Sequence, residues 1–198
     1  MQKGWSIIGN VVGSVDSTNK LILGGSATDL SSNPSGSSQS TVFDVSQIGD
    51  KYQGFSAQEK VGTSTWQLIG TTSALTPWTI SGGTLQINGD GNLGDTASVL
   101  TFDGGTLQFG SGAELSANRA IALKAAGGTI DTRALNNTLA QNITGLGKLT
   151  KNGIGTLTLT GTNAYTGDTK IAAGTLQLGN GGSSGSIVGN VTDNGMLS

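Results

Sequence analysis

Short runs in which apolar and polar side chains alternate recur along this chain. In GTLTL, residues 155–159, Leu157 and Leu159 lie on one side of an extended strand, because successive side chains of a strand point to opposite faces. Thr156 and Thr158 then lie on the other side, and threonine suits a pleated, half-exposed surface. The pattern therefore predicts a β-strand with one buried face and one solvent-facing face.

Variants of this run recur at a nearly constant interval. They read GTLQI, GTLQF, GTIDT, GKLT, GTLTL, GTLQL and GMLS, with leading glycines at Gly83, Gly105, Gly128, Gly147, Gly155, Gly174 and Gly195. The steps between these glycines are 22, 23, 19, 8, 19 and 21 residues. A period near 20 residues is typical of a solenoid, in which each repeat makes one turn. The chain is therefore predicted to be all-β, a parallel β-helix with roughly 20–22 residues per coil.

The step of 8 residues is too short for a complete coil. We therefore expect GKLT and GTLTL to lie on successive faces of one coil, separated by the bend KNGIG at residues 151–155. Stacked coils would align one apolar residue of each repeat into a single aliphatic ladder, formed by Leu85, Leu107, Ile130, Leu149 or Leu157, Leu176 and Leu197. Four aromatic residues share the inward parity of neighbouring aliphatic residues and are predicted to join the core, namely Trp66, Trp78, Phe102 and Phe109.

Residues 1–198 are predicted to form one continuous solenoid. Regular repeats occupy residues 82–198, and less regular coils occupy residues 1–81, with a Ser/Gly-rich loop near 27–41. The N-terminal MQKGWSIIGNVVGS does not read as a secretory signal, because glycine and asparagine break its apolar run. We expect a piece of a longer protein that is truncated at both ends.

The segment KYQGFSAQEK, residues 51–60, has the highest density of charge and is broken by a glycine. The charged and aromatic residues in and beside it are Asp50, Lys51, Tyr52, Phe55, Glu59 and Lys60. We interpret the segment as a protruding, solvated loop, with a binding epitope as the alternative. Loops that leave a rigid scaffold often carry recognition, so residues 27–41 are a second candidate epitope.

The composition supports a folded solenoid and excludes other classes. Glycine supplies 34 of the 198 residues without a collagen period, and proline only 2. Glycine, asparagine and aspartate accept the backbone conformations of tight bends. A hydrophobic content of 34%, in alternating positions, argues against disorder.

Missing residue types exclude several kinds of chemistry. The chain has no cysteine, which excludes disulfides, thiolate nucleophiles and cysteine-based metal sites. It has no histidine, which removes the commonest general base and any Ser-His-Asp triad. The formal net charge is −2 and the basic residues are scattered singly, so a nucleic acid partner is not expected.

The turn NGDGNLGD, residues 88–95, contains four side-chain oxygen donors that could bind calcium: Asn88, Asp90, Asn92 and Asp95. An EF-hand loop requires glycine at its sixth position, where this chain has Leu93, and a glutamate at its twelfth. The solenoid calcium motif GGxGxD is not matched either. We therefore interpret the segment as a polar turn and expect no metal site and no cofactor.

Asp103 and Asp131 lie near equivalent points of adjacent predicted coils, so a pair of carboxylates on one outer face is conceivable. Glycoside hydrolysis needs two carboxyl groups at a defined separation, and Arg119 or Arg133 could serve as the base of a lyase. The acidic residues are dispersed, however, and no aromatic-rich sugar platform accompanies them. We interpret both aspartates as turn caps and predict no catalytic residue and no enzyme.

The spaced motifs together resemble a known family. Residues 144–198, TGLGKLTKNGIGTLTLTGTNAYTGDTKIAAGTLQLGNGGSSGSIVGNVTDNGMLS, resemble the autotransporter-associated β-strand repeat in passenger regions of Gram-negative AIDA-type autotransporters. Upstream segments that also resemble such passengers are residues 42–95, LTFDGGTLQF at 100–109 and RAIALKAAGGTIDT at 119–132. The resemblance covers residues 42–198 well and residues 1–41 loosely.

This resemblance implies a right-handed parallel β-helix that is exported by a signal peptide and a C-terminal outer-membrane β-barrel, neither of which lies in these residues. It places the chain at the bacterial cell surface or in a secreted form. The expected function is a non-catalytic stalk or display segment of a surface adhesin, contacting host extracellular-matrix or cell-surface molecules through exposed loops. Self-association through surface threonine and asparagine ladders, and a carbohydrate-active β-helix enzyme, remain as alternatives.

Overall fold

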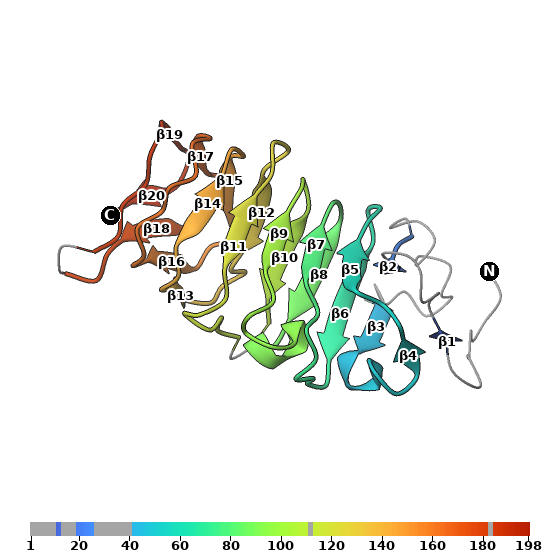
Figure 1. Ribbon diagram of the computed structural model, residues 1–198. Coiled ribbons are helices and arrows are strands. Elements are labelled where there is room, and N and C mark those ends of the chain that lie inside the picture. The colour runs from blue at the N-terminus through green and yellow to red at the C-terminus, as the bar shows by residue number, and fades with distance from the viewer. Residues whose placement is uncertain (1–10, 13–18, 26–40, 111–112, 182–183) are drawn as a thin grey trace.

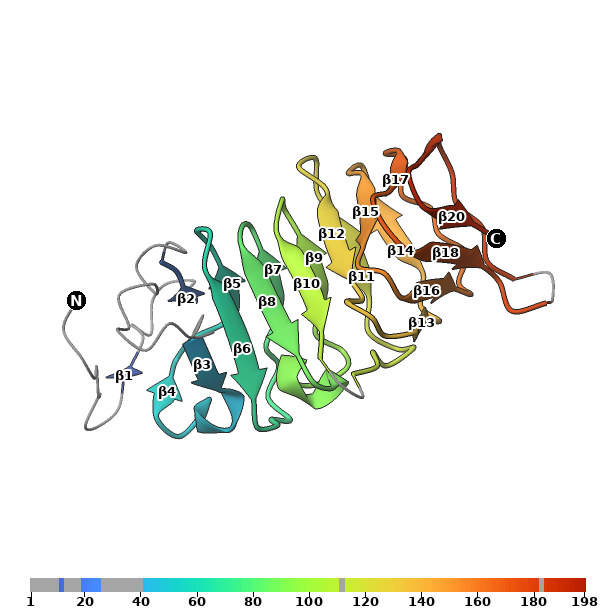
Figure 2. The same cartoon turned by 180° about the vertical axis from the view of Figure 1, so that it is seen from behind.

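The computed structural model describes residues 11–12, 19–25, 41–110, 113–181 and 184–198. In these residues short strands are stacked side by side into an elongated solenoid (Figures 1 and 2). Every strand pair that the structure describes is parallel. The predicted parallel β-solenoid is therefore confirmed.

Three sheets form the faces of the solenoid. The eight-stranded sheet contains, in spatial order, β3 (Thr41–Asp44), β6 (Thr65–Ile69), β8 (Thr84–Ile87), β10 (Thr106–Phe109), β12 (Gly128–Asp131), β15 (Leu149–Asn152), β17 (Thr169–Ile171) and β19 (Val191–Asp193). The six-stranded sheet contains β2 (Lys20–Leu23), β5 (Ala57–Lys60), β7 (Trp78–Ile80), β9 (Leu100–Phe102), β11 (Ile121–Leu123) and β14 (Ile143–Gly145). The four-stranded sheet contains β13 (Asn137–Leu139), β16 (Thr156–Leu159), β18 (Thr175–Leu178) and β20 (Met196–Leu197).

The remaining elements are small. Strand β1 (Val11–Val12) pairs with β4 (Tyr52–Gln53). The described residues also contain the 3₁₀ helices η1 (Val45–Gln47) and η2 (Asp90–Leu93). In the described part of the chain, no helix has the length and apolar character needed to cross a membrane.

The predicted aliphatic ladder is correct only for its first three members. Leu85, Leu107 and Ile130 are aligned in the eight-stranded sheet and fully buried. In the next coil, however, Lys151 is aligned with Ile130, and Leu149 is aligned with Gly128. The column of aliphatic side chains is therefore interrupted by a lysine.

The later repeats belong to a different face. GKLT contributes to β15 and GTLTL to β16, on the eight-stranded and four-stranded sheets respectively, which confirms that they occupy successive faces of one coil. Leu157, Leu176 and Leu197 are aligned with one another in the four-stranded sheet. The single ladder was thus a wrong prediction, because equal spacing along the chain does not specify which face a strand joins. Leu197 is 42% exposed, since β20 has a paired strand on one side only.

The core lies between the sheets and contains three of the four predicted aromatic residues. Trp78, Phe102 and Phe109 are at most 1% exposed, as predicted. Trp66 is only half-buried, and its indole N–H donates to the carbonyl oxygen of Gly24 at 2.8 Å. An indole that keeps its polar edge near the surface avoids burying an unpaired donor.

The interpretation of residues 51–60 as a protruding loop was wrong. The segment contains β4 and all of β5, and β5 pairs on both sides. Glu59 and Lys60 are adjacent in β5, so their side chains face opposite sides of the strand. Glu59 faces outward and accepts from Lys20 at 3.0 Å and from the Ser81 hydroxyl at 2.6 Å, whereas Lys60 faces inward. Residues 26–40, which include most of the predicted loop near 27–41, lie outside the described residues.

Glycine allows the sharp bends between faces. Gly153 and Gly174 have φ values of 82° and 68°, a region that L-residues rarely adopt. A Cβ atom on Gly174 would also collide with the carbonyl oxygens of Gly153 and Gly155 in the preceding coil. The glycine-rich bends that the sequence predicts therefore serve both the local turn and the close stacking of coils.

Candidate functional site

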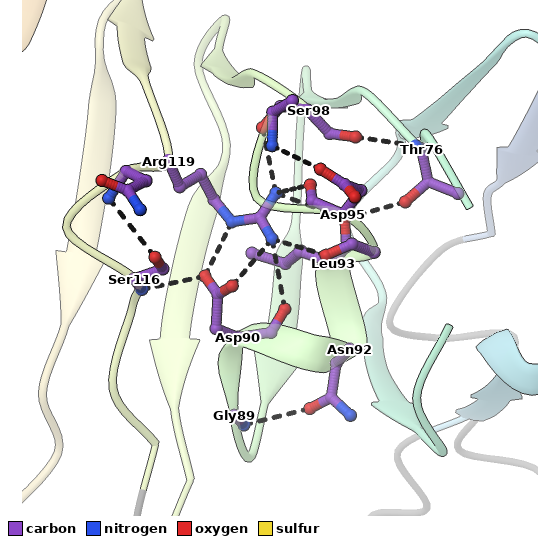
Figure 3. Close-up of polar contacts among 12 residues, drawn as sticks. Thr76, Gly89, Asp90, Asn92, Leu93, Asp95, Ser98, Ser116 and Arg119 are labelled. Atoms are coloured by element: carbon purple, nitrogen blue, oxygen red, sulfur yellow. Dashed lines mark hydrogen bonds and ion pairs between the residues drawn. The ribbon is translucent and has the colours of Figure 1, made fainter. Parts of the chain in front are cut away.

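The most elaborate polar cluster surrounds Arg119, which lies just before β11 and is 1% exposed (Figure 3). Its guanidinium forms a two-pronged ion pair with Asp90, the first residue of η2: Nε donates to Oδ1 at 2.7 Å and Nη2 donates to Oδ2 at 2.9 Å. The backbone N–H of Ser116 donates to the same Oδ1 at 3.0 Å. One carboxylate thus joins η2 to the next coil.

The other donors of Arg119 bind backbone carbonyl groups of the loop that follows η2. Nη1 donates to the carbonyl oxygens of Leu93, Asp95 and Ser98 at 3.3, 3.2 and 2.9 Å. Nη2 donates to the carbonyl oxygen of Gly94 at 2.8 Å. A buried guanidinium is tolerated only when its N–H groups are hydrogen-bonded, and here they close the loop around the side chain.

Three of the four residues predicted to offer side-chain oxygens in residues 88–95, namely Asp90, Asn92 and Asp95, accept hydrogen bonds in this turn. Asn92 Oδ1 accepts from the backbone N–H groups of Asn88 and Gly89 at 2.8 and 3.1 Å, and its Nδ2 donates to the Gly70 carbonyl at 2.6 Å. Asp95 Oδ1 accepts from the N–H of Ala97 at 2.8 Å. The side-chain oxygens of Asn92, Asp90 and Asp95 are therefore directed to backbone or guanidinium donors of the turn rather than toward one common point.

The two aspartates of the hypothetical carboxylate pair lie on different parts of the coil. Asp103 follows β9 and forms an exposed ion pair with Lys124 at 3.5 Å. Asp131 ends β12, is aligned with Gln108, and accepts from the Gln108 side chain at 3.0 Å. The backbone N–H of Arg133 donates to Asp131 Oδ1 at 2.8 Å, so this aspartate also caps a bend. The structure does not bring the two carboxylates together.

Two inward-facing lysines were missed by the sequence reasoning. Lys60 and Lys151 are both 0% exposed. Lys60 Nζ donates to the carbonyl oxygens of Val61 at 2.6 Å and Gly82 at 3.3 Å. Burial lowers the pKa of the Lys60 ammonium. The ammonium group therefore binds one carbonyl group in the bend of its own coil and another in the bend of the next coil.

Lys151 repeats this arrangement at another corner. Its Nζ donates to the carbonyl oxygens of Asn152, Gly153 and Ala173 at 2.9, 2.7 and 3.1 Å. Burial lowers its pKa as well, opposed by the negative charge of Asp131. The sequence signal that could have identified both lysines is the shared pattern K-x-G, followed three residues after its glycine by a strand that begins with threonine, at Thr65 and at Thr156.

The outer face of the eight-stranded sheet carries two straight rows of polar side chains. We call the first the threonine row; its members, aligned one per coil, are Thr65, Thr84, Thr106, Thr129, Thr150, Lys170 and Thr192. We call the second the amide row; its members are Gln67, Gln86, Gln108, Asp131 and Asn152. All of these residues are half-buried or exposed. Together the rows form a nearly uncharged polar face.

Comparisons with known proteins place this geometry in context. The passenger-associated-transport-repeat family matches residues 59–87 and 149–178. Over 153 residues, which are 77% of the chain, the sequence is 42% identical to the protein named "Adhesin BmaC autotransporter" of Brucella suis biovar 1 (strain 1330). The chain spans 4% of that protein's length. No solved structure matches the chain significantly.

The two matched segments contain the two buried lysines at equivalent positions. Lys60 precedes Gly62 as Lys151 precedes Gly153, and each lysine binds a carbonyl oxygen 22 residues further along. In this chain, both matched segments thus place a buried lysine against the carbonyl groups of a bend. With the parallel solenoid and the two matched repeats, the 42% identity over 77% of the chain shows that the chain belongs to the autotransporter passengers.

Proposed function

We propose that this region acts as a non-catalytic display stalk of a bacterial surface adhesin. The observation that carries the proposal is the continuous stack of parallel strands, in which the charged clusters of the described residues hold bends and loops closed. A solenoid whose coils contact only their neighbours extends by adding coils, which suits projection of a binding region away from the cell. The adhesin name of the similar Brucella protein supports this role.

Contact with host extracellular-matrix or cell-surface molecules would then use the exposed surface of the solenoid. Residues 51–60 are largely folded into β4 and β5, so the outer sheet faces and corners remain as candidate contact surfaces in the described part of the chain. Export through the outer membrane by a β-barrel of the full-length protein, and location at the cell surface, follow from the family resemblance as part of the same proposal.

A deletion that preserves register tests the stalk. Thr84, Thr106 and Thr129 occupy the same position of successive coils, so removing residues 84–128 joins Gly83 to Thr129 and deletes two whole coils. In the full-length passenger displayed on cells, we expect unchanged surface level and unchanged adhesion, with the projection shortened by about 10 Å.

A deletion of residues 84–117 is the matched control, because it joins Gly83 to Asn118 and breaks the register. We expect it to reduce the surface level through misfolding. If the two-coil deletion keeps the surface level but abolishes adhesion, the region itself binds the target and is not a stalk.

Self-association is a second candidate, favoured by the polar face. Hydroxyl and amide groups both donate and accept hydrogen bonds. A second copy presents them at the same interval of about 4.8 Å, the distance between neighbouring strands. Contacts that are weak in a single coil, when repeated in every coil, add up to a strong association between two copies.

The test introduces positive charges on the polar face. Gln86→Lys with Gln108→Lys, on neighbouring strands, is expected to abolish dimers that light scattering detects in the unmodified protein. Thr158→Lys with Gln177→Lys is the matched control, because these residues are also aligned neighbours but lie on the four-stranded sheet. Purely monomeric unmodified protein at all concentrations would contradict self-association.

A further inference from the structure

Three N-x-T tripeptides occur in the last third of the sequence, at Asn136, Asn142 and Asn190. In each of them the asparagine and the threonine two residues later are exposed. The asparagines that the structure shows to be buried, Asn92, Asn137 and Asn163, do not begin such a tripeptide. N-x-S/T is the acceptor sequence of asparagine-linked glycosylation, which requires an accessible side chain.

Asn136 and Asn142 are held in the same way by the following coil. The backbone N–H of Thr156 donates to Asn136 Oδ1 at 3.0 Å, and the backbone N–H of Thr162 donates to Asn142 Oδ1 at 2.7 Å. Both links span 20 residues. Because the partner is an N–H donor, the carbonyl oxygen of each side chain must face it.

The opposite atom of each amide is therefore turned away from the next coil. Among the hydrogen bonds of the described residues, Nδ2 of Asn136 and of Asn142 donates none, whereas Nδ2 of Asn190 donates to Asp168 at 3.3 Å. Nδ2 is the atom that a glycosyltransferase modifies. The hydrogen bond that links each of these side chains to the next coil uses the other atom, Oδ1, and leaves Nδ2 available.

We propose that Asn136 and Asn142 are glycosylation sites, each accepting one sugar from a nucleoside diphosphate sugar. In the reaction Nδ2 forms a bond to the anomeric carbon, the bond from that carbon to the diphosphate oxygen breaks, and one Nδ2 proton is lost to a base of the transferase. The nucleoside diphosphate leaves with the electron pair of the broken bond. The product is still an amide, so Oδ1 continues to accept from Thr156 or Thr162 and the coil stays capped.

The test is peptide mapping by mass spectrometry of the full-length protein purified from the cells that produce it. We expect the mass of one sugar on Asn136 and on Asn142, and none on the buried Asn137 and Asn163. Unmodified Asn136 and Asn142, or sugars found on hydroxyl groups alone, would overturn the proposal.

Two variants separate recognition of the tripeptide from an effect on folding. Thr144→Val keeps the shape of the side chain but removes the hydroxyl, together with its hydrogen bond to the Ile121 carbonyl oxygen at 3.3 Å. We expect loss of the sugar on Asn142, with Asn136 still modified as the control for folding. Ile154→Thr creates a new tripeptide at the exposed Asn152, and Ile154 is 77% exposed, so the fold should tolerate the change. We expect a new sugar on Asn152. Retention of the sugar in Thr144→Val, or no gain in Ile154→Thr, would count against these sites.

Discussion

Each fully buried cation of the described chain is surrounded by oxygen atoms of the backbone. Arg119 contacts five carbonyl groups and one carboxylate. Lys60 and Lys151 each contact carbonyl groups of two successive bends. Moving a charged group from water into the protein interior costs several kcal/mol of free energy, and these hydrogen bonds must offset that cost. Their benefit is therefore structural: each cation fixes a loop or corner by binding several of its carbonyl groups at once, and some of these groups, such as those of Gly94 and Ser98, have no other donor in the described residues.

The substitution Arg119→Met tests whether the buried guanidinium stabilises the loop after η2. The substitution removes the positive partner of Asp90, which keeps the Ser116 N–H as a donor, and it removes the donors to the carbonyl groups of Gly94 and Ser98. We therefore expect a loss of about 3 kcal/mol in the free energy of unfolding, measured by urea denaturation. Lys124→Met is the control, because the Lys124–Asp103 pair is exposed and worth less than about 1 kcal/mol. Equal losses in the two variants would show that Arg119 does not stabilise the loop.

The contribution of Lys151 to the free energy of unfolding is expected to depend on pH, which the substitution Lys151→Met can test. Burial lowers the pKa of Lys151 in the folded chain below its value of about 10.4 in the unfolded chain. Between these two values the unfolded chain binds more protons, so the contribution of Lys151 to stability rises with pH. The difference in unfolding free energy between the native chain and Lys151→Met should therefore change in favour of the native chain as the pH is raised toward about 10.4, the pKa of the unfolded chain. A difference independent of pH would contradict this account.

The candidate site could be predicted from the sequence only in part. The polar turn at residues 88–95 was recognised, because Asn92 and Asp95 cap groups within a few residues. The partner of Asp90 was not, because Arg119 lies 29 residues away and approaches only when two coils are stacked. The inward direction of Lys60 was also missed, since composition alone places a lysine in solvent.

At the scale of the strand and its bends, the same repeat is used on different faces of the solenoid. The first matched segment turns from β5 on the six-stranded sheet to β6 on the eight-stranded sheet. The second turns from β15 on the eight-stranded sheet to β16 on the four-stranded sheet. The repeat therefore specifies a strand, a corner and a strand, and leaves open which corner of the coil they form.

This freedom explains which parts of the fold the sequence predicted. The alternation in GTLQI and GTLTL gave both strands and their buried sides, because burial of Leu85 and Leu157 depends on local parity. The sheet that each strand joins depends on the length of the whole preceding coil. A period of about 20 residues is the same for both sheets, so Leu85 and Leu157 could not be assigned to different columns.

Gly155→Ala tests the close stacking at a corner. A Cβ atom at this position would collide with the carbonyl oxygen of Leu135 in the preceding coil. Because a backbone atom cannot move aside easily, we expect a loss of about 1–3 kcal/mol in unfolding free energy, measured by urea denaturation. Gly89→Ala is the control: its Cβ would meet nothing within 4 Å, and the stability should stay within about 0.5 kcal/mol. If both variants were equally stable, the corners would not be tightly packed.

At the scale of the whole molecule, each strand that the structure describes in the three large sheets pairs only with strands of adjacent coils. The sheet order follows the chain from β3 to β19 without a strand returning from a distant segment. In such an arrangement stability is approximately a sum of terms for single coils and for pairs of adjacent coils. Damage to one coil should therefore weaken the adjacent coils more than the distant ones.

Leu157→Ala, read by amide hydrogen exchange, tests this locality. Leu157 is fully buried in β16, and a buried leucine replaced by alanine costs about 2–5 kcal/mol. We expect faster exchange in β13, β16 and β18, which lie side by side in the four-stranded sheet, and unchanged protection in β8 and β10. Leu146→Ala is the control, because this leucine is 76% exposed and its loss should leave exchange unchanged throughout. Faster exchange spread evenly from β8 to β18 would mean that the solenoid unfolds as one cooperative unit, and it would contradict the local coupling between adjacent coils.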